Sequence, residues 1–557
     1  MVNIKQEIIK VIEKEVNTKV ELEVPPDSGL GDYALPCFSL AKVFKKNPNE
    51  IAQDLAKKIP LDETIEKIDV KGPYLNFFIN KNKLIEGTLK QIIKEKQKYG
   101  SCFEKNKKAL VEHTSINPNA SPHVGRARNA LIGDSITKLL LFQGYKVETH
   151  YLVNDVGKQI AMLVLACEGK KKIEFNDLLK IYVNFNKKIE KKPELEEKVF
   201  ELLHKLEKGD EKTKKRFRDI VDICVKGQIK ILNELGIDYD YFDYESDYLW
   251  KKETENVLER LEKTNKLFKD DEGRFVLDQK DFDLAMKSRV LVLTRADKTS
   301  LYPLRDIAYT IDKINKKFER NIIVLGEDQK LYFQQLEAAL SLLGYKAPEV
   351  IHYSFVLLTE GKMSTRKGKL VLLEDFMEEA LEKAKKEILK RDKKASKKSL
   401  AKAKSIGYGA VKYAILKVSP EKNVIFDWEK ALAFEGDTGP YLQYAYARIC
   451  SILRKSGGKI NYDVDYALLK QKEEIALVKQ LSGFPLVIEQ STKQLRPHLI
   501  ANYLYSLSQS LSEFYHNCQV LKEREDLKKA RLLLIYCVKQ VLENGLNLLG
   551  IDVLERM

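Results

Sequence analysis

The spacing of hydrophobic and polar positions changes at about residue 100 and again at about residue 375. Over residues 3–16 and 48–59, apolar side chains recur every three or four positions, which predicts two amphipathic helices. The two helical patterns flank the turn-rich stretch "PPDSGLGDYALP". The segment "EKIDVKGPYLNFFIN", which comes after the second helix and before a polar linker, is typical of β-strands. We therefore expect a small α+β unit in the first hundred residues.

The pattern that follows the linker predicts a strand, a helix and a second strand. "ALVEHTSI" is an apolar, β-prone run, and "YKVETHYLV" is read as a second strand. Between them, "GRARNALIGDSITKLLLFQ" places Ile132, Ile136 and Leu140 on one face of a helix. Because parallel strands are joined by crossover helices, this order predicts a parallel sheet.

Later segments predict charged helices, further strands and then a helical region. Residues 168–235 are charged and helical in pattern, and we interpret them as a solvated helical hairpin. Strand-type runs return at "GRFVLD", "RVLVLTR", "NIIVLGED" and "VIHYSFVLL". From about residue 375 the pattern is almost wholly helical and includes the basic stretch "KRDKKASKKSLAKAK".

Length and charge add a domain count and a candidate partner. A chain of 557 residues is too long for one hydrophobic core, so we expect three or four domains. Lysine and arginine exceed aspartate and glutamate by 97 − 82 = 15. This excess favours a polyanion such as nucleic acid, but a lysine-rich solubilising surface explains the charge equally well.

Cysteine spacing and hydropathy indicate a cytoplasmic protein. The seven cysteines lie far apart and form no CxxC pair, so neither a zinc site nor a disulfide framework is expected. The chain contains no run of about 18 apolar residues, so no membrane span is expected. The start "MVNIKQEIIKVIEKEV" is a charged amphipathic helix rather than a signal peptide.

The stretch "NPNASPHVGRARNALIGD" carries candidate phosphate chemistry. A loop between a parallel strand and its helix is where such sheets bind nucleotides, and a helix N-terminus offers free N–H groups. Gly125 lets a ligand approach the backbone, and His123 can stabilise charge on a phosphate oxygen. The alternative is that His123 is a helix cap or a surface group.

The region from "VEHTS" to "NDVGKQ" resembles the HIGH-motif region of class I aminoacyl-tRNA synthetases, and within them the arginyl-tRNA synthetases. The family pattern is matched by Asn154, Asp155, Gly157 and Gln159 after the second strand. The resemblance implies that arginine is bound by Glu112, Ser115 and Asn117, and ATP by His123, Gly125 and Asn129.

Arg126 departs from the family pattern, which usually has a second histidine at this position. An arginine there either donates to a carboxylate as a permanently charged fork or repels a cationic substrate. The interpretation of Arg126 as a catalytic and arginine-binding residue therefore leaves both alternatives open.

"KMSTRKG" resembles the KMSKS loop of the same class. A cationic, glycine-closed loop can fold over a triphosphate and offset charge as pyrophosphate leaves. The second lysine of the general class pattern is Thr365 here, a replacement that is common in the arginyl-tRNA synthetases. The catalytic residues implied in this loop are Lys362, Met363, Ser364, Arg366 and Lys367, with Lys362 also contacting ATP.

"SLYPLRDIAYTID" matches the family's Tyr-x-x-Arg-Asp pattern for the amino-acid pocket. Tyr302 and Asp306 are four residues apart, so they share a helix face where a guanidinium can lie; the alternative is an ordinary amphipathic helix with a core tyrosine. Glu245 matches a second acid, and Gln329 a residue that holds the α-ammonium or carboxylate. Gly326 and Asp328 are predicted to contact ATP, whereas Tyr332 stands where the family often has histidine and is given no role in the chemistry.

Two acids and a tyrosine suit a flat group with five donors better than they suit lysine. Each hydrogen bond to a charged group contributes roughly 1.5–3 kcal/mol, and such sites reject a partner lacking the group by roughly 10⁴-fold. We therefore expect no editing domain.

Two surfaces resemble the family's tRNA-binding regions. Tyr441, Tyr444 and Arg448 form one helical stripe that suits stacking on anticodon bases, although such a stripe is more often core. The resemblance adds Tyr515 and Met557 near the anticodon. In the N-terminal unit, the resemblance implies that a stacking and hydrogen-bonding surface for the tRNA elbow is formed by Tyr74, Asn76 and Phe78. For Tyr74 and Phe78, packing of a small core is a nearly equal alternative.

The fold class implied is an α/β Rossmann-type catalytic core with a parallel sheet, an N-terminal α+β additional domain and an all-α C-terminal anticodon-binding (DALR) domain. The expected ranges are 1–100 for the N-terminal tRNA-binding domain, 101–375 for the catalytic domain with a helical insertion at about 168–235, 376–430 for a helical connector, and 431–557 for the DALR domain. The ending resembles the family's usual terminus, so we expect a complete chain.

The implied activity is arginine–tRNA ligation, with ATP and Mg²⁺ as the substrate complex and no zinc or organic cofactor. We expect tRNA(Arg) and L-arginine as partners, and a cytoplasmic monomer that does not bind membranes. Three rivals remain: a class I synthetase for cysteine or glutamate, a catalytically inactive tRNA-binding paralogue, which Arg126 favours, and a small-molecule nucleotidyltransferase.

Overall fold

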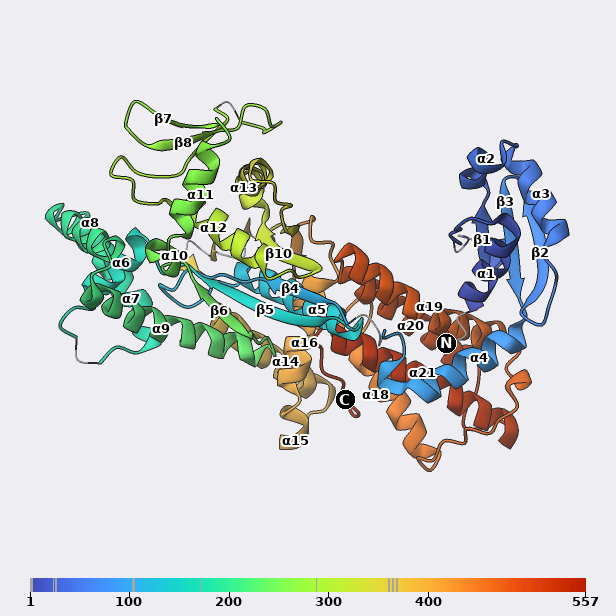
Figure 1. Ribbon diagram of the computed structural model, residues 1–557. Helices are drawn as coiled ribbons and strands as arrows, with labels where there is room; N and C mark the ends of the chain where they lie inside the picture. The colour runs from blue at the N-terminus through green and yellow to red at the C-terminus, as the bar shows by residue number, and fades with distance from the viewer. Residues whose placement is uncertain are drawn as a thin grey trace.

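Five apolar runs form one parallel sheet at the centre of the molecule (Figure 1). The computed structural model describes residues 1–557 except 1–3, 24, 26–27, 103–105, 171, 287, 359–360, 363–364 and 367–368. The spatial order is β11-β10-β4-β5-β6, and every neighbouring pair is parallel. The strands are β4 (Lys108–Glu112), β5 (Lys146–Val153), β6 (Tyr241–Tyr244), β10 (Arg320–Gly326) and β11 (Glu349–Tyr353).

The direction of the chain reverses between β4 and β10. From β4 the chain continues outward through β5 to β6 and then returns to add β10 and β11 on the other side of β4. In open α/β sheets, the crevice at such a switch point, beyond the carboxyl ends of the strands, is where ligands bind. The topology therefore points to the ends of β4 and β10 as the site.

Alternate strand residues enter two different cores, one on each face of the sheet. Ile322 and Val324 belong to a core that also contains helix α5 (Gly125–Phe142). Ile323 and Leu325 pack against a second core. That core is formed largely by α11 (Glu253–Glu262), α12 (Tyr302–Asn315) and α13 (Lys330–Leu342). This period of two is what a strand buried on both faces requires.

Arg128 of α5 fastens the later part of the chain to the sheet. Its side chain is buried and donates to the carbonyls of Ser354 at 2.6 Å, Phe355 at 3.3 Å and Ser419 at 2.9 Å. Ser419 lies beyond α16, so one side chain joins the sheet to the helical connector.

Two insertions extend from the sheet, one between β5 and β6 and one between β6 and β10. The sequence predicted only the first of them, as a helical insertion at about 168–235. The helices after β5 are α6 (Lys158–Ala166), α7 (Phe175–Ile189), α8 (Glu194–Glu207) and α9 (Glu211–Glu234). After β6 come the helices α10 (Asp247–Trp250) and α11, and an antiparallel sheet of β7 (Leu267–Lys269), β8 (Phe275–Asp278) and β9 (Val290–Val292). "GRFVLD" and "RVLVLTR" therefore do form strands, but outside the parallel sheet.

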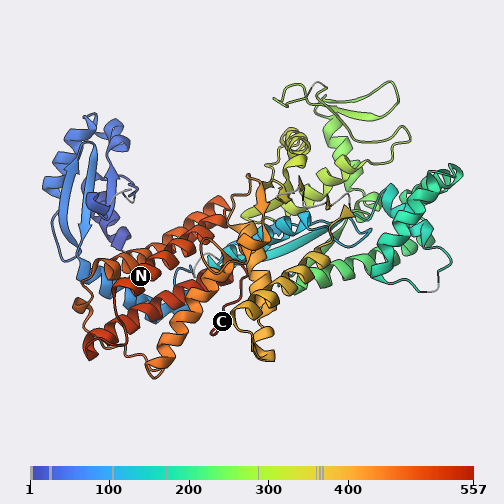
Figure 2. The ribbon, with the colours of Figure 1, turned by 180° about the vertical axis from the view of Figure 1, so that it is seen from behind.

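The N-terminal unit is an antiparallel sheet of order β1-β3-β2 covered by helices, at one end of the molecule (Figure 2). Its elements are α1 (Ile4–Val16), η1 (Ser28–Leu30), β1 (Tyr33–Pro36), α2 (Phe38–Phe44), α3 (Pro48–Lys58), β2 (Ile65–Lys71) and β3 (Tyr74–Ile79). The next helices, α4 (Lys81–Glu95) and η2 (Lys96–Lys98), pack on the C-terminal helices instead. Tyr99 donates to the carbonyl of Leu481 at 2.9 Å, and Asn544 donates to that of Lys96 at 3.0 Å.

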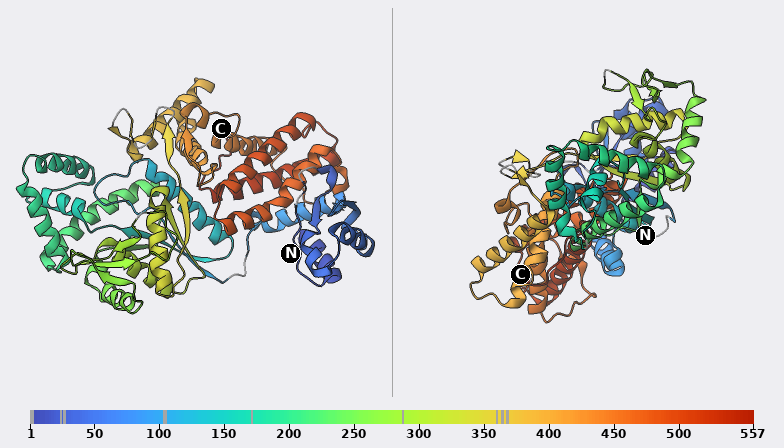
Figure 3. Two further views of the ribbon diagram at one scale, coloured as in Figure 1. Left: turned by 90° about the horizontal axis from the view of Figure 1, so that it is seen from above. Right: turned by 90° about the vertical axis from the view of Figure 1, so that its left-hand side faces the viewer.

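The rest of the chain is mostly helical, and the left view of Figure 3 shows its last helices, in orange and red, between the sheet and the N-terminal unit. Short strands follow β11: β12 (Val356–Leu358), β13 (Gly361–Lys362), β14 (Thr365–Arg366) and β15 (Lys369–Leu370). The connector contains α14 (Leu373–Arg391), α15 (Lys397–Leu400), α16 (Ala403–Leu416), β16 (Val424–Phe426) and α17 (Trp428–Ala431). The last helices are α18 (Gly439–Lys455), η4 (Tyr466–Leu468), α19 (Lys472–Gln494), α20 (His498–Asn517) and α21 (Glu525–Leu548).

The C-terminal helices touch helix α5 directly. Ser135 of α5 donates to the carbonyl of Leu548, at the end of α21, at 2.9 Å. Among the described residues, no helix is both long and apolar enough to cross a bilayer.

Candidate active site

His123 lies at the switch point, immediately before the first turn of α5. Gly125 is what lets the imidazole fold back over that turn, because a Cβ at position 125 would lie 3.1 Å from both Cε1 and Nδ1 of His123. Within the described part of the chain, the buried Nδ1 has no hydrogen-bond partner. Burial, and then the charge of Arg126, lower the pKa of His123. The site thus presents an imidazole that resists protonation beside the N-terminus of α5, where the amides of Arg126 and Ala127 already donate to the carbonyls of His123 and Val124.

The turn after β4 is strained and firmly held. Thr114 and Ser115 have φ values of 82° and 43°, which non-glycine residues rarely adopt. The amide of Thr114 donates to Oδ1 of Asn129 at 2.6 Å, and its hydroxyl shares a 2.6 Å hydrogen bond with Tyr239. Asn129 also donates to the carbonyl of Val324 at 2.8 Å. Asn129, predicted to bind ATP, therefore ties together the ends of β4 and β10.

The histidine loop is joined to the base of the "KMSTRKG" hairpin. The amide of Val124 donates to the carbonyl of Val371 at 3.0 Å, and that of Leu373 to the carbonyl of Pro122 at 2.8 Å. His123 and Leu372 form an isolated β-bridge between these two bonds. The two sequence motifs that are predicted to handle phosphates are therefore neighbours in space.

The hairpin itself is described only in part. Lys362 lies in β13, which pairs with β12, and Arg366 lies in β14, which pairs with β15. The predicted residues Met363, Ser364 and Lys367 lie outside the described residues.

An acidic cluster with two tyrosines, at the predicted amino-acid pocket, is formed by the starts of α12 and α13 and the turn after β6. Asp306 accepts a hydrogen bond from the hydroxyl of Tyr332, and the rings of Tyr302 and Tyr332 are 5.2 Å apart. Glu245 is buried, and its charge acts on Asp306. Tyr302 is 54% exposed, so this side of the cluster is open to solvent. Tyr332, to which the sequence analysis gave no role in the chemistry, orients the carboxylate of Asp306.

Arg305 holds Glu245 in place. Its Nε donates to Oε1 of Glu245 at 2.7 Å, and both side chains are buried. The guanidinium also donates to the backbone carbonyl of Ser300. One oxygen of Glu245 is therefore engaged by the protein, and within the described residues no hydrogen bond or ion pair engages the other. The sequence signal that could have indicated this ion pair is the arginine that directly precedes Asp306 in "YPLRD".

Asp155, which matches the family pattern after β5, supports the turn that carries Glu245. It accepts from the amide of Ser246 at 2.8 Å and from its hydroxyl at 2.6 Å. The amide of Glu245 donates to the carbonyl of Val153 at 3.0 Å. Burial raises the pKa of Asp155 to about 6.

Several predicted site residues have other surroundings. Glu112 is no free acid of the pocket, because it is buried in an ion pair with Lys313 of α12. Gly326 is buried at the end of β10, where a Cβ would lie 2.3 Å from Oδ1 of Asp328. Asp328 and Gln329 are exposed on η3 (Glu327–Gln329). Ser115 and Arg126 are half-buried, and Asn117, which accepts from Asn154 at 3.4 Å, is exposed.

The pKa of Asp306 predicts that arginine is used better at higher pH. Burial and then the charge of Glu245 raise this pKa to about 7, and Glu112 adds to the rise, whereas the Tyr332 hydrogen bond and Arg305 lower it. Below about pH 7 the free protein carries a protonated Asp306, and a guanidinium needs the carboxylate. We expect the KM for arginine in ATP–pyrophosphate exchange to fall between about pH 6 and about pH 8. A pH-independent KM would contradict this assignment.

Four of the five predicted anticodon residues line one cavity of about 190 Å³. Tyr441 is held by hydrogen bonds to the carbonyl of Ser508 and to the hydroxyl of Ser512. Tyr444 is 43% exposed, and the guanidinium of Arg448 lies 4.5 Å from the centre of the Tyr515 ring. The cavity is lined by Arg391, Phe434, Glu435, Tyr441, Tyr444, Ala445, Arg448, Leu511, Ser512 and Tyr515. Met557 is exposed and is not part of that lining.

The N-terminal surface needs one correction. Asn76 is only 3% exposed, so its amide does not face a partner as predicted. Tyr74 is exposed and packs edge-on against Phe38, with the ring centres 5.8 Å apart. Phe78 lies under the ammonium of Lys67 at 5.0 Å. Asn76 shares one face of β3 with Tyr74 and Phe78, but it lies in the middle of this central strand, between Ala34 of β1 and Asp69 of β2.

Comparisons with known proteins cover the whole chain. The model "tRNA synthetases class I (R), catalytic domain" matches residues 88–428, more than half of the chain, which places the fold and the site in that class. "Arginyl tRNA synthetase N terminal domain" matches residues 2–79, and "DALR anticodon binding domain" matches 442–557. The chain belongs to the arginyl-tRNA synthetase family.

Individual relatives agree. The arginine–tRNA ligase of Methanocaldococcus jannaschii is 41% identical across 100% of this chain and 98% of that protein. That of Clostridioides difficile is 37% identical, with the same coverage. The structure of Thermus thermophilus arginyl-tRNA synthetase superposes with a TM-score of 0.86 at 28% identity, covering all of both chains.

The predicted family and fold class are confirmed by these matches and by the observed sheet. The roles of individual site residues and the domain boundaries remain predictions.

Proposed function

We propose that this protein ligates L-arginine to tRNA(Arg) in two steps. In the first, the arginine carboxylate attacks the α-phosphate of ATP, which gives arginyl-adenylate and pyrophosphate. In the second, a hydroxyl of the terminal adenosine of tRNA, the 2′-hydroxyl by family resemblance, attacks the mixed anhydride and releases AMP. The prediction of an arginine–tRNA ligase is confirmed by membership of the family, which gives no support to an inactive paralogue.

The observation that carries the substrate assignment is the pair of acids near α12. Asp306 and the free oxygen of Glu245 offer acceptors to a planar group with five donors, and Tyr302 offers a face for it to stack on. Lysine, with three donors in a tetrahedral head, would leave acceptors unpaired. Specificity then follows from the cost of buried groups without partners.

At the other end of the site, positioning and charge stabilisation are sufficient for the chemistry. We assign to His123 and the N-terminus of α5 the stabilisation of charge on the α-phosphate. We assign to the hairpin cations Lys362, Arg366 and Lys367 the stabilisation of the leaving pyrophosphate. No protein nucleophile is needed, and Mg²⁺ enters with ATP as part of the substrate.

Finer features are also proposals. We propose a cytoplasmic monomer with no resident metal; the described residues contain no cluster of three or more histidine, cysteine, aspartate or glutamate side chains that suits a metal ion. We propose that residues 1–100 contact the tRNA elbow, 101–375 perform the chemistry, 376–430 connect, and 431–557 bind the anticodon.

A charging experiment tests the function. We expect purified protein to attach arginine, and none of the other nineteen amino acids, to a tRNA pool. ATP–pyrophosphate exchange with and without tRNA will show whether the first step requires it, as the family resemblance implies. If tRNA is bound but no pyrophosphate is released, the inactive paralogue is the correct interpretation.

A further inference from the structure

Nearly half of the protein's net positive charge lies in fifteen consecutive residues. Residues 390–404, here called the basic hairpin, contain seven lysines, one arginine and one aspartate, so their net charge is 8 − 1 = +7, against +15 for the chain. They comprise the last residues of α14, a turn, α15 and the start of α16. Figures 1 and 2 show α15 projecting from the side of the molecule rather than packed within it.

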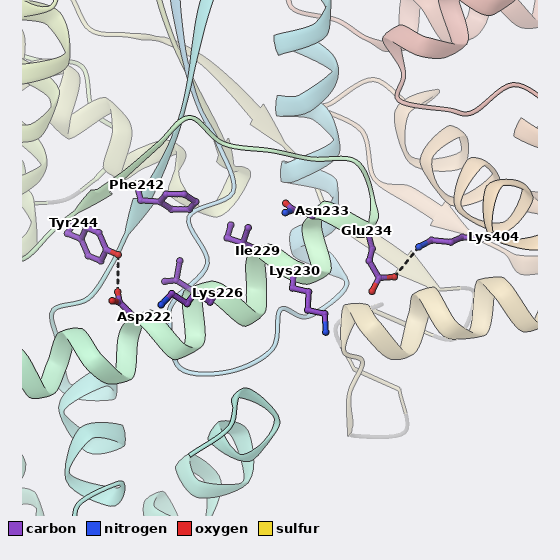
Figure 4. A pocket seen from close by; sticks show the side chains of 10 residues that line it. Asp222, Lys226, Ile229, Lys230, Asn233, Glu234, Phe242, Tyr244 and Lys404 are labelled. Atoms are coloured by element: carbon purple, nitrogen blue, oxygen red, sulfur yellow. Dashed lines mark hydrogen bonds and ion pairs between the residues drawn. The ribbon is translucent and has the colours of Figure 1, made fainter. Parts of the chain in front are cut away.

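Only part of this charge is neutralised by the protein. Glu387 pairs with Lys390 at 3.2 Å and with Arg391 at 3.5 Å. Lys404 points back toward α9, where it lies 3.4 Å from Glu234 at the edge of a separate cavity (Figure 4). Asp392 accepts from the backbone amide of Lys394 at 3.0 Å, so the one acid of the hairpin is used to hold its turn.

Five lysines remain. In the part of the chain that the structure describes, no ion pair or hydrogen bond engages their ammonium groups, and four of the five are exposed. They are Lys393, Lys394, Lys397, Lys398 and Lys402. Like charges brought this close repel one another, so the arrangement is stabilised by a polyanion.

The basic hairpin begins at the rim of the anticodon cavity. The guanidinium of Arg391 lies 3.9 Å from the centre of the Phe434 ring, and both side chains line the cavity together with Tyr444 and Arg448. An RNA base that enters this cavity therefore has its own phosphates, and those of its neighbours, within reach of the hairpin.

We propose that the basic hairpin binds the sugar–phosphate backbone of the anticodon arm of tRNA while a loop base occupies the Tyr444 cavity. This inference rests on the proposed function, because that function supplies the RNA. Lysine is well suited to the role, since it contacts phosphates as a point charge and carries no base specificity. The hairpin is expected to supply affinity and salt dependence, and the cavity is expected to supply recognition.

A second lysine-rich segment provides a comparison. Residues 187–198 contain five lysines and four glutamates, a net charge of 5 − 4 = +1, so their charge is balanced locally. Lys187, Lys188, Lys191 and Lys192 are exposed and have the same spacing as Lys393, Lys394, Lys397 and Lys398. They lie on α7 and just before α8, at the far side of the sheet from the C-terminal helices (Figure 1).

The test compares two quadruple lysine-to-glutamine variants of the full chain, one at positions 393, 394, 397 and 398 and one at positions 187, 188, 191 and 192. Binding of the anticodon stem–loop of tRNA(Arg) and of full-length tRNA is measured between about 0.05 and about 0.2 M KCl. We expect the hairpin variant to bind both RNAs at least about 10-fold more weakly, with a salt slope smaller by roughly 0.7–0.9 for each phosphate that the protein no longer neutralises. The comparison variant should bind the stem–loop as the unchanged protein does.

Charging kinetics extend the test. In the hairpin variant the KM for tRNA should rise while kcat at saturating tRNA stays the same, and arginine in place of the four lysines should restore binding. Unchanged affinity and salt slope, an equal decrease in the comparison variant, or a decrease confined to full-length tRNA would each overturn the inference. If the unchanged protein does not charge tRNA with arginine, the proposed function itself fails, and that result is distinct from all three.

Discussion

Replacing Asp306 by asparagine is expected to lower kcat/KM for arginine by roughly 30-fold to several thousand-fold. Removing one member of a desolvated, hydrogen-bonded charge pair costs about 2–5 kcal/mol, and each 1.4 kcal/mol is a factor of ten. Asparagine keeps the shape and can still accept from Tyr332, but it presents no charge to the guanidinium. The measurement is arginine-dependent ATP–pyrophosphate exchange at saturating ATP.

Two controls make this result specific. Tyr332→Phe keeps the Asp306 carboxylate and removes one hydrogen bond to it, so it should raise the KM for arginine by roughly tenfold with little change in kcat. The KM for ATP should be unchanged in both variants, because we propose that the acidic cluster contacts the amino acid and not ATP. If Asp306→Asn left both the KM for arginine and kcat unaltered, Asp306 would not belong to the pocket.

The same substitution should not weaken the fold. Because the pKa of Asp306 in the folded protein lies above its ordinary value of 3.8, the folded chain binds this proton more tightly than the unfolded chain does. Stability contributed by this group is therefore present at low pH and is lost as pH rises from about 4 to about 7. Asparagine removes that pH-dependent destabilisation, so Asp306→Asn should unfold at an equal or higher temperature at pH 8. Such a gain is expected where a site keeps a destabilising charge for function.

His123→Ala is expected to slow adenylate formation by roughly 10²–10³-fold, the scale of removing one donor to a developing oxyanion. The effect should fall on kcat with little change in the KM for arginine, because His123 is at the α5 end of the site and not among the acids. Stability should change little, since the buried Nδ1 has no partner among the described residues. Single-turnover formation of arginyl-adenylate measures the rate.

Gly125→Ala provides the matched control for position. A Cβ at residue 125 would lie 3.1 Å from the imidazole and would push it away from the helix turn, so this variant should also react more slowly although His123 is present. A normal exchange rate in His123→Ala would show that the imidazole does not stabilise the α-phosphate. The N-terminus of α5 would then be the remaining candidate for that role.

Sequence patterns predicted the strands and the helix around the candidate site, but they did not predict how the shorter strands pair. Strand β4 was predicted by its continuous apolar run, which burial on both faces of a parallel sheet imposes. Helix α5 was predicted by its helical periodicity, and β5 by its β-prone residues. The small sheet β7–β9 was not separated from the central one, since a short apolar run carries no record of which strand it will pair with.

The candidate site shows the same division. Tyr302 and Asp306 could be placed together by helical spacing, and Glu245 by resemblance. The bond from Arg305 to Glu245, the bond from Tyr332 to Asp306 and the burial of Glu112 against Lys313 join segments far apart in the chain. Such pairings depend on tertiary packing, which no local pattern contains. The strained turn at Thr114 could not be predicted either, because a β-branched residue rarely adopts a positive φ and its presence gives no local signal for one.

A crystal structure with L-arginine and a non-hydrolysable ATP analogue tests the central claim most directly. We expect the guanidinium to donate to Asp306 and to the second oxygen of Glu245 at about 2.7–2.9 Å and to lie against Tyr302, with the arginine carboxylate directed toward the α-phosphate beside His123. An arginine side chain bound away from both acids, with Asp306 and Glu245 unaltered, would contradict it.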